Sequence, residues 1–257
     1  MPATIAAIVA KLGNAARRFD IDVLPSCDST NALLLARAEA GAPSGTVVIA
    51  EEQTAGRGRR GRSWFSSPGD SLTFSLLWRF APGTAPAGLS LAVGVAVARA
   101  LQKVGAGDTA LKWPNDILKE GRKLGGILVE LVPGAPHAAV IGIGINLQLP
   151  PGMPDDVRAA SAAVGAIDAA DSDALYAALL GELLATLESF GSGGFAALRR
   201  EWLARHAFQD IPVSIASDFG APVVGICRGV DSDGALLLDV DGRSERILSG
   251  EVSLRRV

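Results

Sequence analysis

The sequence has 257 residues, 49% hydrophobic and 20% charged, so it is long enough to bury a sizeable core. Its formal net charge of −3 argues against a general nucleic-acid-binding protein, for which a basic domain is expected. Two widely separated cysteines and two histidines argue against a zinc site or a disulfide framework, and favour a reduced, cytoplasmic chain. We also expect neither a signal peptide nor a membrane span, because no stretch reaches about 18 uninterrupted apolar residues.

Short elements are predicted in the N-terminal part of the chain. Apolar residues at helical spacing predict one short helix within residues 4–18, and residues 19–24 are typical of a strand. The polar run Asp28–Asn31 precedes an Ala- and Leu-rich segment, which predicts a helix over residues 32–40. Polar residues at its start can simply cap the helix, or can face a ligand together with the free N–H groups there.

The segment Gly56–Arg62 contains four arginines and three glycines in seven positions. Glycine weakens both helices and strands, so we predict a loop between a strand at residues 46–50 and another at residues 71–80. Guanidinium groups beside closely approaching backbone N–H groups suit a polyanion such as phosphate. The spacing differs from that of the P-loop, and an exposed basic loop without a ligand is the alternative.

The middle of the chain predicts a sheet with a central helix. Residues 71–80 alternate as a half-buried strand does, and residues 89–104 are apolar nearly all round, which predicts a buried helix. A strand from Leu111 enters a polar turn at Pro114. After a hairpin tip at residues 120–122, two glycine-bearing strands are predicted, residues 123–130 and residues 138–147. Adjacent glycines in a strand often mark the close approach of a ligand or of another backbone segment.

The composition changes in the last quarter of the chain. Residues 155–206 have helical spacing, whereas residues 211–257 hold short β-like runs separated by Asp-Gly pairs, which are strong hairpin signals. We therefore predict a catalytic domain over residues 1–208 and a small β domain of about five strands over residues 209–257. The predicted fold class is α+β, a mixed, largely antiparallel sheet packed with helices.

Polar side chains gather at the predicted strand ends and loops, which is the layout expected of a pocket on a sheet. Cations outnumber carboxylates among them, so the ligand should be an anion carrying phosphates. No Ser-His-Asp set or paired-carboxylate pattern is present, which favours catalysis by positioning and electrostatic stabilisation. The candidates are Ser29, Thr30, Asn31, Gln53, the arginines of residues 57–62, Lys112, Asn115, Asp116, Lys123 and Asn146.

Five motifs and a C-terminal segment carry a resemblance to a known family. They are Asp28–Asn31, Gln53–Arg62, Lys112–Asp116, Arg122–Glu130, Gly142–Leu147 and Gly250–Arg255. Their order resembles that of biotin protein ligases, and this resemblance covers nearly the whole chain from about residue 20. It implies the fold of the biotin–lipoyl ligases, related to class II synthetases, followed by an SH3-like barrel. It also implies ATP and biotin as substrates, Mg²⁺, and a biotinyl-5′-AMP intermediate whose acyl group passes to a lysine of a biotin carboxyl carrier protein domain.

The resemblance assigns roles to individual positions. Lys123, Arg57 and Arg59 would be catalytic, with Lys123 at the reacting carboxylate and α-phosphate. Biotin would contact Ser29, Thr30, Asn31, Gln53, Arg57, Gly58, Arg59, Lys123, Gly126 and Leu128. The nucleotide would contact Arg59, Arg62, Trp64, Lys112, Asn115, Asp116, Asn146 and Arg255, with Asp116 also a candidate Mg²⁺ ligand. Trp64 can equally be a core residue, and Glu251 and Arg255 can equally form a salt bridge between domains.

Two other functions are compatible with parts of the sequence. A lipoate–protein ligase shares the implied fold and chemistry, although the arginine-rich segment favours biotin. An RNA-binding module that uses an Arg-Gly segment is a competing class, but it predicts a basic surface with interleaved aromatic residues. Too few residues precede residue 20 for a winged helix-turn-helix, so we expect a monofunctional ligase that binds neither DNA nor membrane, with a homodimer as one assembly open to it.

Overall fold

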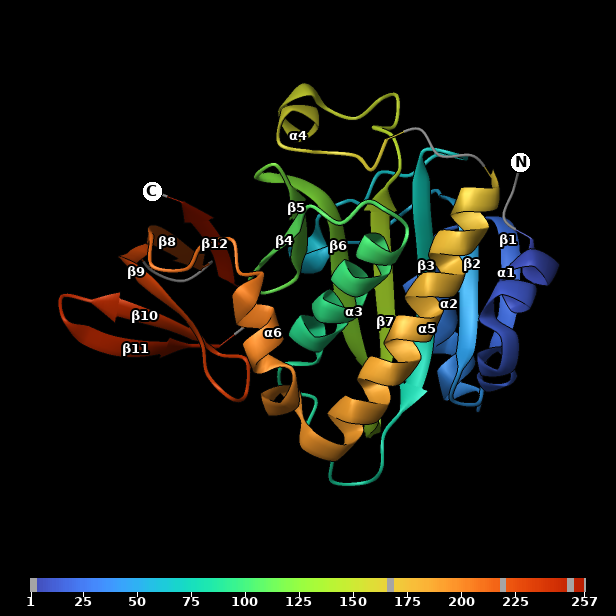
Figure 1. The fold of residues 1–257 in the computed structure, drawn as a ribbon, viewed down its shortest axis with the longest axis horizontal. Coiled ribbons are helices and arrows are strands. Elements are labelled where there is room, and N and C mark those ends of the chain that lie inside the picture. The colour runs from blue at the N-terminus through green and yellow to red at the C-terminus, as the bar shows by residue number, and fades with distance from the viewer. Residues whose placement is uncertain (1–3, 166–168, 218–220, 249–251, 257) are drawn as a thin grey trace.

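The computed structural model describes residues 4–165, 169–217, 221–248 and 252–256. Within them, a seven-stranded mixed sheet with strand order β1-β2-β3-β7-β6-β5-β4 forms the centre of the molecule (Figure 1). β1 and β2 are parallel and are connected through helix α2, while the other neighbouring strands are antiparallel. The strands are β1 (Asp20–Cys27), β2 (Thr46–Gln53), β3 (Ser71–Arg79), β4 (Thr109–Lys112), β5 (Asp116–Lys119), β6 (Arg122–Val132) and β7 (Ala135–Asn146).

Helices cover both faces of this sheet. α1, α3 and α5 enclose the larger hydrophobic core on one face, whereas α2 packs on the other face against β2, β3 and β7. This arrangement confirms the predicted α+β class. The helices are α1 (Ile5–Leu12), α2 (Thr30–Glu39), α3 (Leu89–Lys103), α4 (Asp155–Ala159), α5 (Ala169–Gly193) and α6 (Arg199–Ala204), with 3₁₀ turns at Gly13–Arg18, Arg59–Gly61 and Phe195–Ala197.

Strand β3 is buried on both faces, so the half-buried strand that its alternation predicts is wrong. Leu72, Phe74 and Leu76 belong to the larger core, while Leu77 packs with Leu34 of α2 on the opposite face. The polar residues that create the alternation therefore face a covered surface rather than solvent. One of them is Ser75, which is fully buried and hydrogen-bonded to the start of α2.

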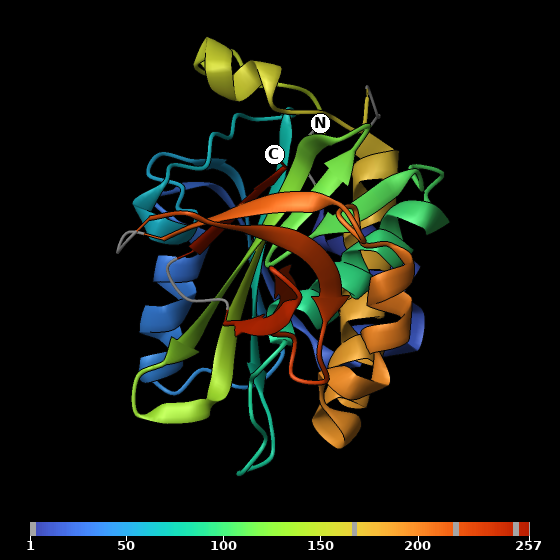
Figure 2. The ribbon, with the colours of Figure 1, turned by 90° about the vertical axis from the view of Figure 1, so that its left-hand side faces the viewer.

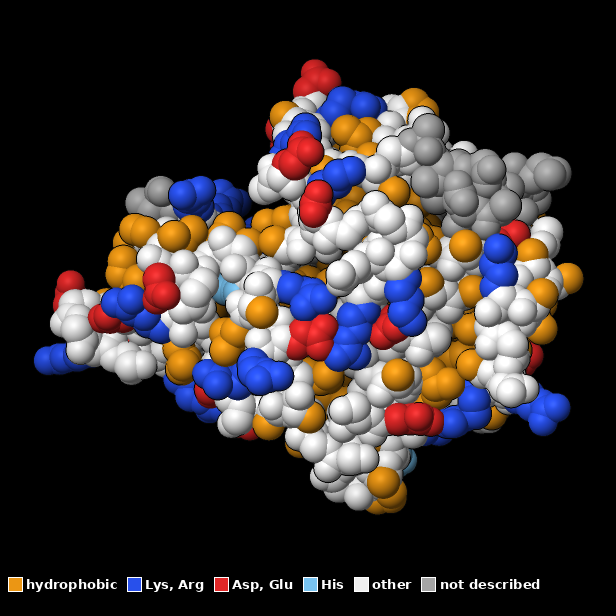
Figure 3. Space-filling view, viewed as in Figure 1, with side chains coloured by type: hydrophobic (Ala, Val, Ile, Leu, Met, Phe, Trp, Pro, Cys, Tyr) orange, Lys and Arg blue, Asp and Glu red, His pale blue; other side chains and the backbone are white. Residues whose placement is uncertain are grey.

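Helix α5 is a core helix, although residues 172–193 are long and apolar enough by length and composition to cross a membrane. Leu179, Leu180, Leu183 and Leu187 are fully buried among the side chains of the larger core. The solvent-facing side of the helical layer has charges of both signs interspersed (Figure 3). Arg99 of α3, for example, pairs with acidic residues of both α5 and α6.

The C-terminal residues form a separate five-stranded antiparallel sheet, of order β11-β10-β9-β8-β12, which confirms the predicted SH3-like module. It lies beside the β4 end of the central sheet (Figure 1, Figure 2). Its turns at Gly234 and Gly242 have positive φ, as the Asp-Gly pairs predict. The boundary at residues 208/209 stays a prediction. The strands are β8 (Pro212–Ser217), β9 (Val223–Val230), β10 (Leu236–Val240), β11 (Arg243–Ile247) and β12 (Val252–Arg256).

Candidate active site

A cleft lies on the α2 face of the sheet, between the start of α2 and the arginine loop, Gly56–Arg62. It has a wide outer part of about 820 Å³ and a narrow inner part of about 50 Å³, and both are lined by Arg57, Arg59 and Asn115. The structure therefore brings together segments that are far apart in the sequence. Lining the inner part are all the residues predicted to contact biotin: Ser29, Thr30, Asn31, Gln53, Arg57, Gly58, Arg59, Lys123, Gly126 and Leu128.

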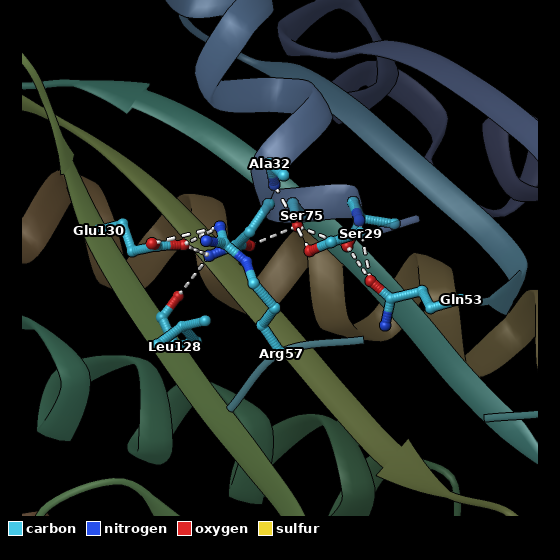
Figure 4. Close-up of polar contacts among 9 residues, drawn as sticks. Ser29, Ala32, Gln53, Arg57, Ser75, Leu128 and Glu130 are labelled. Atoms are coloured by element: carbon cyan, nitrogen blue, oxygen red, sulfur yellow. Dashed lines mark hydrogen bonds and ion pairs between the residues drawn. The ribbon is translucent and has the colours of Figure 1, made fainter. Parts of the chain in front are cut away.

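The start of α2 supplies a buried polar network at the inner end of the cleft (Figure 4). Ser29 is the N-cap, and its hydroxyl accepts a hydrogen bond from the Ala32 N–H at 3.5 Å, as the purely structural interpretation predicts. Gln53 Oε1 accepts from the backbone N–H of Thr30 at 2.8 Å and lies 3.1 Å from its hydroxyl. The end of β2 and the first turn of α2 thus hold each other in place.

The Asn31 carboxamide is almost entirely occupied by protein partners. Its Nδ2 donates to the Leu128 carbonyl at 3.2 Å and to Glu130 Oε2 at 2.8 Å, and its Oδ1 accepts from Ser75 at 2.6 Å. It lies so close to Gly142 that a Cβ there would be 2.2 Å from Asn31 Oδ1. Although Asn31 lines the cleft, its amide mainly fixes the surrounding strands. Ser75 is a site residue that lies outside the sequence motifs, whereas Glu130 and Gly142 lie within motifs but are given no role there.

The arginine loop is a hydrogen-bonded hairpin rather than an extended coil. Its ends are joined by the Gly58 N–H, which donates to the Arg62 carbonyl at 2.7 Å, and by an antiparallel bridge between Arg57 and Ser63. Arg57 is ion-paired with Glu130 at 3.1 Å. These contacts hold the loop against β6.

Arg59 reaches across the cleft to the turn that follows β4. Its NH1 donates to Asn115 Oδ1 at 3.3 Å, and Asn115 Nδ2 donates to the Ile127 carbonyl at 2.9 Å. Asn115 therefore connects the loop to β6. Arg62 lines the outer part of the cleft, and its contact with the nucleotide stays a prediction.

Trp64 forms one wall of the inner cleft. Its ring lies against Gly144 of β7, where an added Cβ would be 2.4 Å from Trp64 Cε2. The Lys123 ammonium is 6.0 Å from the ring centroid. Trp64 Nε1 is buried and has no hydrogen-bond partner among the residues that the structure describes, so it is available to an acceptor on a ligand.

Lys123 belongs to a small charge cluster at the base of the cleft. Its Nζ is 2.7 Å from Asp116 Oδ1, and Lys112 Nζ is 3.5 Å from Asp116 Oδ2. Burial would raise the pKa of Asp116, but the two ammonium groups more than offset this and hold that pKa below its ordinary value. Asp116 thus stays ionised and holds the Lys123 side chain in place through this ion pair.

The other predicted nucleotide contacts lie outside the cleft wall. Lys112 and Asp116 lie behind Lys123, and Asn146 Nδ2 donates to the backbone carbonyls of Ala162 and Lys123, at 3.0 and 3.4 Å. Arg255 is exposed on β12, and Glu251 lies outside the described residues. Within the described ranges, no group of three acidic, histidine or cysteine side chains could hold a metal.

Both parts of the chain match known protein families. The Biotin/lipoate A/B protein ligase family matches residues 23–146, and the Biotin protein ligase C terminal domain matches residues 211–255. The Bifunctional ligase/repressor BirA of Escherichia coli is 41% identical over 91% of this chain and 74% of its own. The biotin--[acetyl-CoA-carboxylase] ligase of Mycobacterium tuberculosis is 38% identical over 90% of this chain and 88% of its own.

A solved structure supports the same relationship. The biotin protein ligase from Aquifex aeolicus in complex with biotin and ATP has a TM-score of 0.78 and 27% identity, covering 93% of this chain and 99% of that one. Together with the two matched domains and the extent of the sequence similarity, this likeness confirms the family and the enzyme class predicted from the motifs. The chain is a member of the biotin protein ligase family.

Proposed function

We propose that this protein activates biotin with ATP and then transfers the biotinyl group to a lysine of a biotin carboxyl carrier protein domain. One observation carries the proposal: the arginine loop and Lys123 converge on a cleft whose inner end is a neutral polar network. A neutral network suits an uncharged ring system with hydrogen-bonding edges, while the cationic mouth suits a carboxylate and phosphates. Biotin and ATP together present both kinds of surface.

In the first step, a biotin carboxylate oxygen attacks the α-phosphorus of ATP, and the bond to the β-phosphate breaks to release pyrophosphate. Both reacting groups are anionic, so they repel each other until cations lie between them. Lys123 and the arginine loop supply these cations, and Asp116 holds the Lys123 ammonium in place at 2.7 Å. The remaining catalytic contribution is alignment of the two substrates.

In the second step, the amine of the carrier lysine attacks the acyl carbon of biotinyl-5′-AMP, and the bond between that carbon and the AMP oxygen breaks. The mixed anhydride is reactive towards water, so the site must be shielded until the carrier arrives. The hydrogen-bonded arginine loop is suited to this shielding, because it covers β6 and is tied to it through Arg57 and Asn115.

Magnesium would bind here mainly to the phosphates of the nucleotide, and not to a preformed set of protein ligands. Mg²⁺ typically binds one or two carboxylates together with substrate phosphates, where it neutralises phosphate charge. Asp116 is the acidic side chain nearest Lys123, but both of its oxygens are already paired with ammonium groups. We therefore propose that the metal enters with ATP, and that Asp116 is the carboxylate of the described residues positioned to bind it.

The proposal extends to the acceptor protein and to the cellular compartment. The Mycobacterium tuberculosis relative is named for acetyl-CoA carboxylase, which supports a carboxyl carrier domain as the acceptor. We propose that the protein acts in the cytoplasm and binds no DNA. Interspersed charge on the helical face supports the absence of a nucleic-acid surface there (Figure 3).

The proposal is tested by pyrophosphate release from ATP, with biotin or lipoate as the second substrate. We expect release to depend on biotin and to be absent with lipoate, because the loop and the C-terminal domain resemble those of biotin ligases. Release that depends on lipoate and not on biotin would replace this function with that of a lipoate ligase. Retention of bulk RNA in a gel-shift assay, without pyrophosphate release, would favour an RNA-binding module instead.

A further inference from the structure

Glu130 is a charged residue that lines the cleft but has no part in the two reaction steps proposed for it. It lies on β6 two residues beyond Leu128, so by the period of a strand both side chains point to the face that carries the cleft. Its side chain is 28% exposed, which leaves it accessible from the cleft yet held by neighbours. A carboxylate here is unexpected, because the substrates of the proposed reaction are themselves anions.

Both oxygens of the Glu130 carboxylate are engaged (Figure 4). Oε2 accepts from Asn31 Nδ2 at 2.8 Å and from Arg57 NH2 at 3.1 Å, and Oε1 lies 3.3 Å from the same nitrogen. Asn31 is buried and held in place, since its Nδ2 also donates to the Leu128 carbonyl and its Oδ1 accepts from Ser75. Glu130 thus connects a fixed donor at the start of α2 to a side chain of the arginine loop.

Arg57 is held from one side only. Its NH2 contacts both carboxylate oxygens of Glu130, while its Nε and NH1 have no partner among the described residues. A guanidinium group presents its donors in a rigid planar fork, so fixing one nitrogen also sets the direction of the others. An ion pair this exposed adds little to folding stability, and its main physical effect is geometric.

We propose that Glu130 is a positioning residue, which orients the Arg57 guanidinium so that its remaining donors face the carboxylate or phosphate of the ligand. This inference rests on the proposed function, and it assigns Glu130 a part in that same site. Orientation before binding lowers the cost of ordering a flexible side chain, so it strengthens binding of biotin and retention of biotinyl-5′-AMP.

The test is the variant Glu130→Gln, with the dissociation constant of biotin measured by calorimetry and the release rate of biotinyl-5′-AMP measured separately. Gln keeps an oxygen for Asn31 but loses the charge that holds Arg57. We expect both quantities to rise about tenfold, the effect of one charge-assisted hydrogen bond, with an unchanged melting temperature. Glu120→Gln is the matched control, because it removes a charge from the exposed pair with Arg122 outside the cleft.

A double-mutant cycle separates positioning from a structural role. In an Arg57→Ala background, Glu130→Gln should have no further effect, because the group that it orients is gone. An equal effect in both backgrounds would show that Glu130 acts through Asn31, and unchanged or tighter biotin binding in the single variant would also overturn the inference. Failure of the wild-type protein to bind biotin would refute the proposed function itself, and with it the inference.

Discussion

Lys123 is held by its neighbours at both its backbone and its ammonium group. Its backbone is fixed on both sides, because its N–H donates to the Ala160 carbonyl and its own carbonyl accepts from Ala162. Its ammonium is fixed by Asp116, whose lowered pKa keeps the carboxylate ionised at neutral pH. A cation with both ends held can stabilise developing charge without reorganising, which is the basis of electrostatic preorganisation.

Replacing Lys123 with Met should therefore slow pyrophosphate release by roughly 10²-fold or more, the effect of removing a preorganised charge-stabilising group. Lys112 remains 3.5 Å from Asp116, so the buried carboxylate keeps one partner and the fold should persist. Stopped-flow detection of pyrophosphate measures the rate of release, and circular dichroism checks that the fold persists. Lys11→Met, on the exposed side of α1, is the control. Wild-type release rates in Lys123→Met would remove Lys123 from the catalytic role.

At the scale of elements, two glycines of β7 make room for side chains that pack across this strand. Gly142 leaves room for the Asn31 carboxamide, and Gly144 leaves room for the Trp64 ring. The alternating Gly-Ile pattern thus buries isoleucines in the larger core on one face and admits side chains of α2 and the loop on the other. The glycines are required by close approach and not by backbone conformation, since neither has a positive φ.

Gly144→Ala should displace the Trp64 ring, because the new Cβ would lie 2.4 Å from it. We expect weaker biotin binding and about 1–3 kcal/mol lower free energy of unfolding, the usual cost of overpacking. Gly181→Ala in α5 is the contrasting control, since nothing lies within 4 Å of its Cβ. That change should raise the free energy of unfolding by about 0.5–1 kcal/mol through helix propensity. Equal melting temperatures for the two variants would contradict this account of β7.

The junction between α6 and the C-terminal sheet contains a buried histidine. His206 stacks on Trp202 with ring centroids 4.6 Å apart, its Nε2 is 3.4 Å from Cys227 Sγ, and its Nδ1 has no partner among the described residues. Burial lowers the pKa of His206 from 6.5 to about 4. The imidazole is therefore neutral in the folded protein at any pH above that value, while the unfolded chain takes up a proton below about pH 6.5.

Because the unfolded state binds more protons between pH 6.5 and pH 4, the free energy of unfolding should fall as the pH falls through this window. The loss attributable to His206 is about 3 kcal/mol, fully present by pH 4. Denaturant titrations of His206→Phe should lack this component. His137→Gln, which removes the other histidine, should keep it. Parallel pH profiles for His206→Phe and the wild type would contradict the assignment.

At the scale of the whole molecule, the two domains meet close to the cleft. Trp113 Nε1 donates to the Gly234 carbonyl at 3.0 Å, and Gly234 itself lines the outer part of the cleft beside Gly88. The hairpin turn that an Asp-Gly pair predicts thus becomes a wall of the site. That turn could be predicted from the sequence because its signal is local, whereas its place against α3 depends on how the two sheets pack.

The difference between local sequence signals and long-range packing also explains which residues of the candidate site could be predicted. Gln53, Arg57 and Lys123 lie in compact motifs, so the order of those motifs is enough to find them. Ser75 lies outside every motif, and Glu130 ends one without an assigned role, because the contacts of both depend on strand pairing and on the placement of α2. The burial of β3 on both faces has the same origin. Pattern within a segment is visible in the sequence, but the surface that a segment faces is set by distant residues.

We propose that the cleft makes an acyl-adenylate and transfers its acyl group to a protein lysine. The most direct measurement is mass spectrometry of a purified biotin carboxyl carrier domain after incubation with the protein, biotin and ATP. We predict one biotinyl group on a single lysine, dependent on both substrates, and none when that lysine is replaced by arginine. An unmodified carrier despite pyrophosphate release, or a modified carrier without ATP, would contradict the claim.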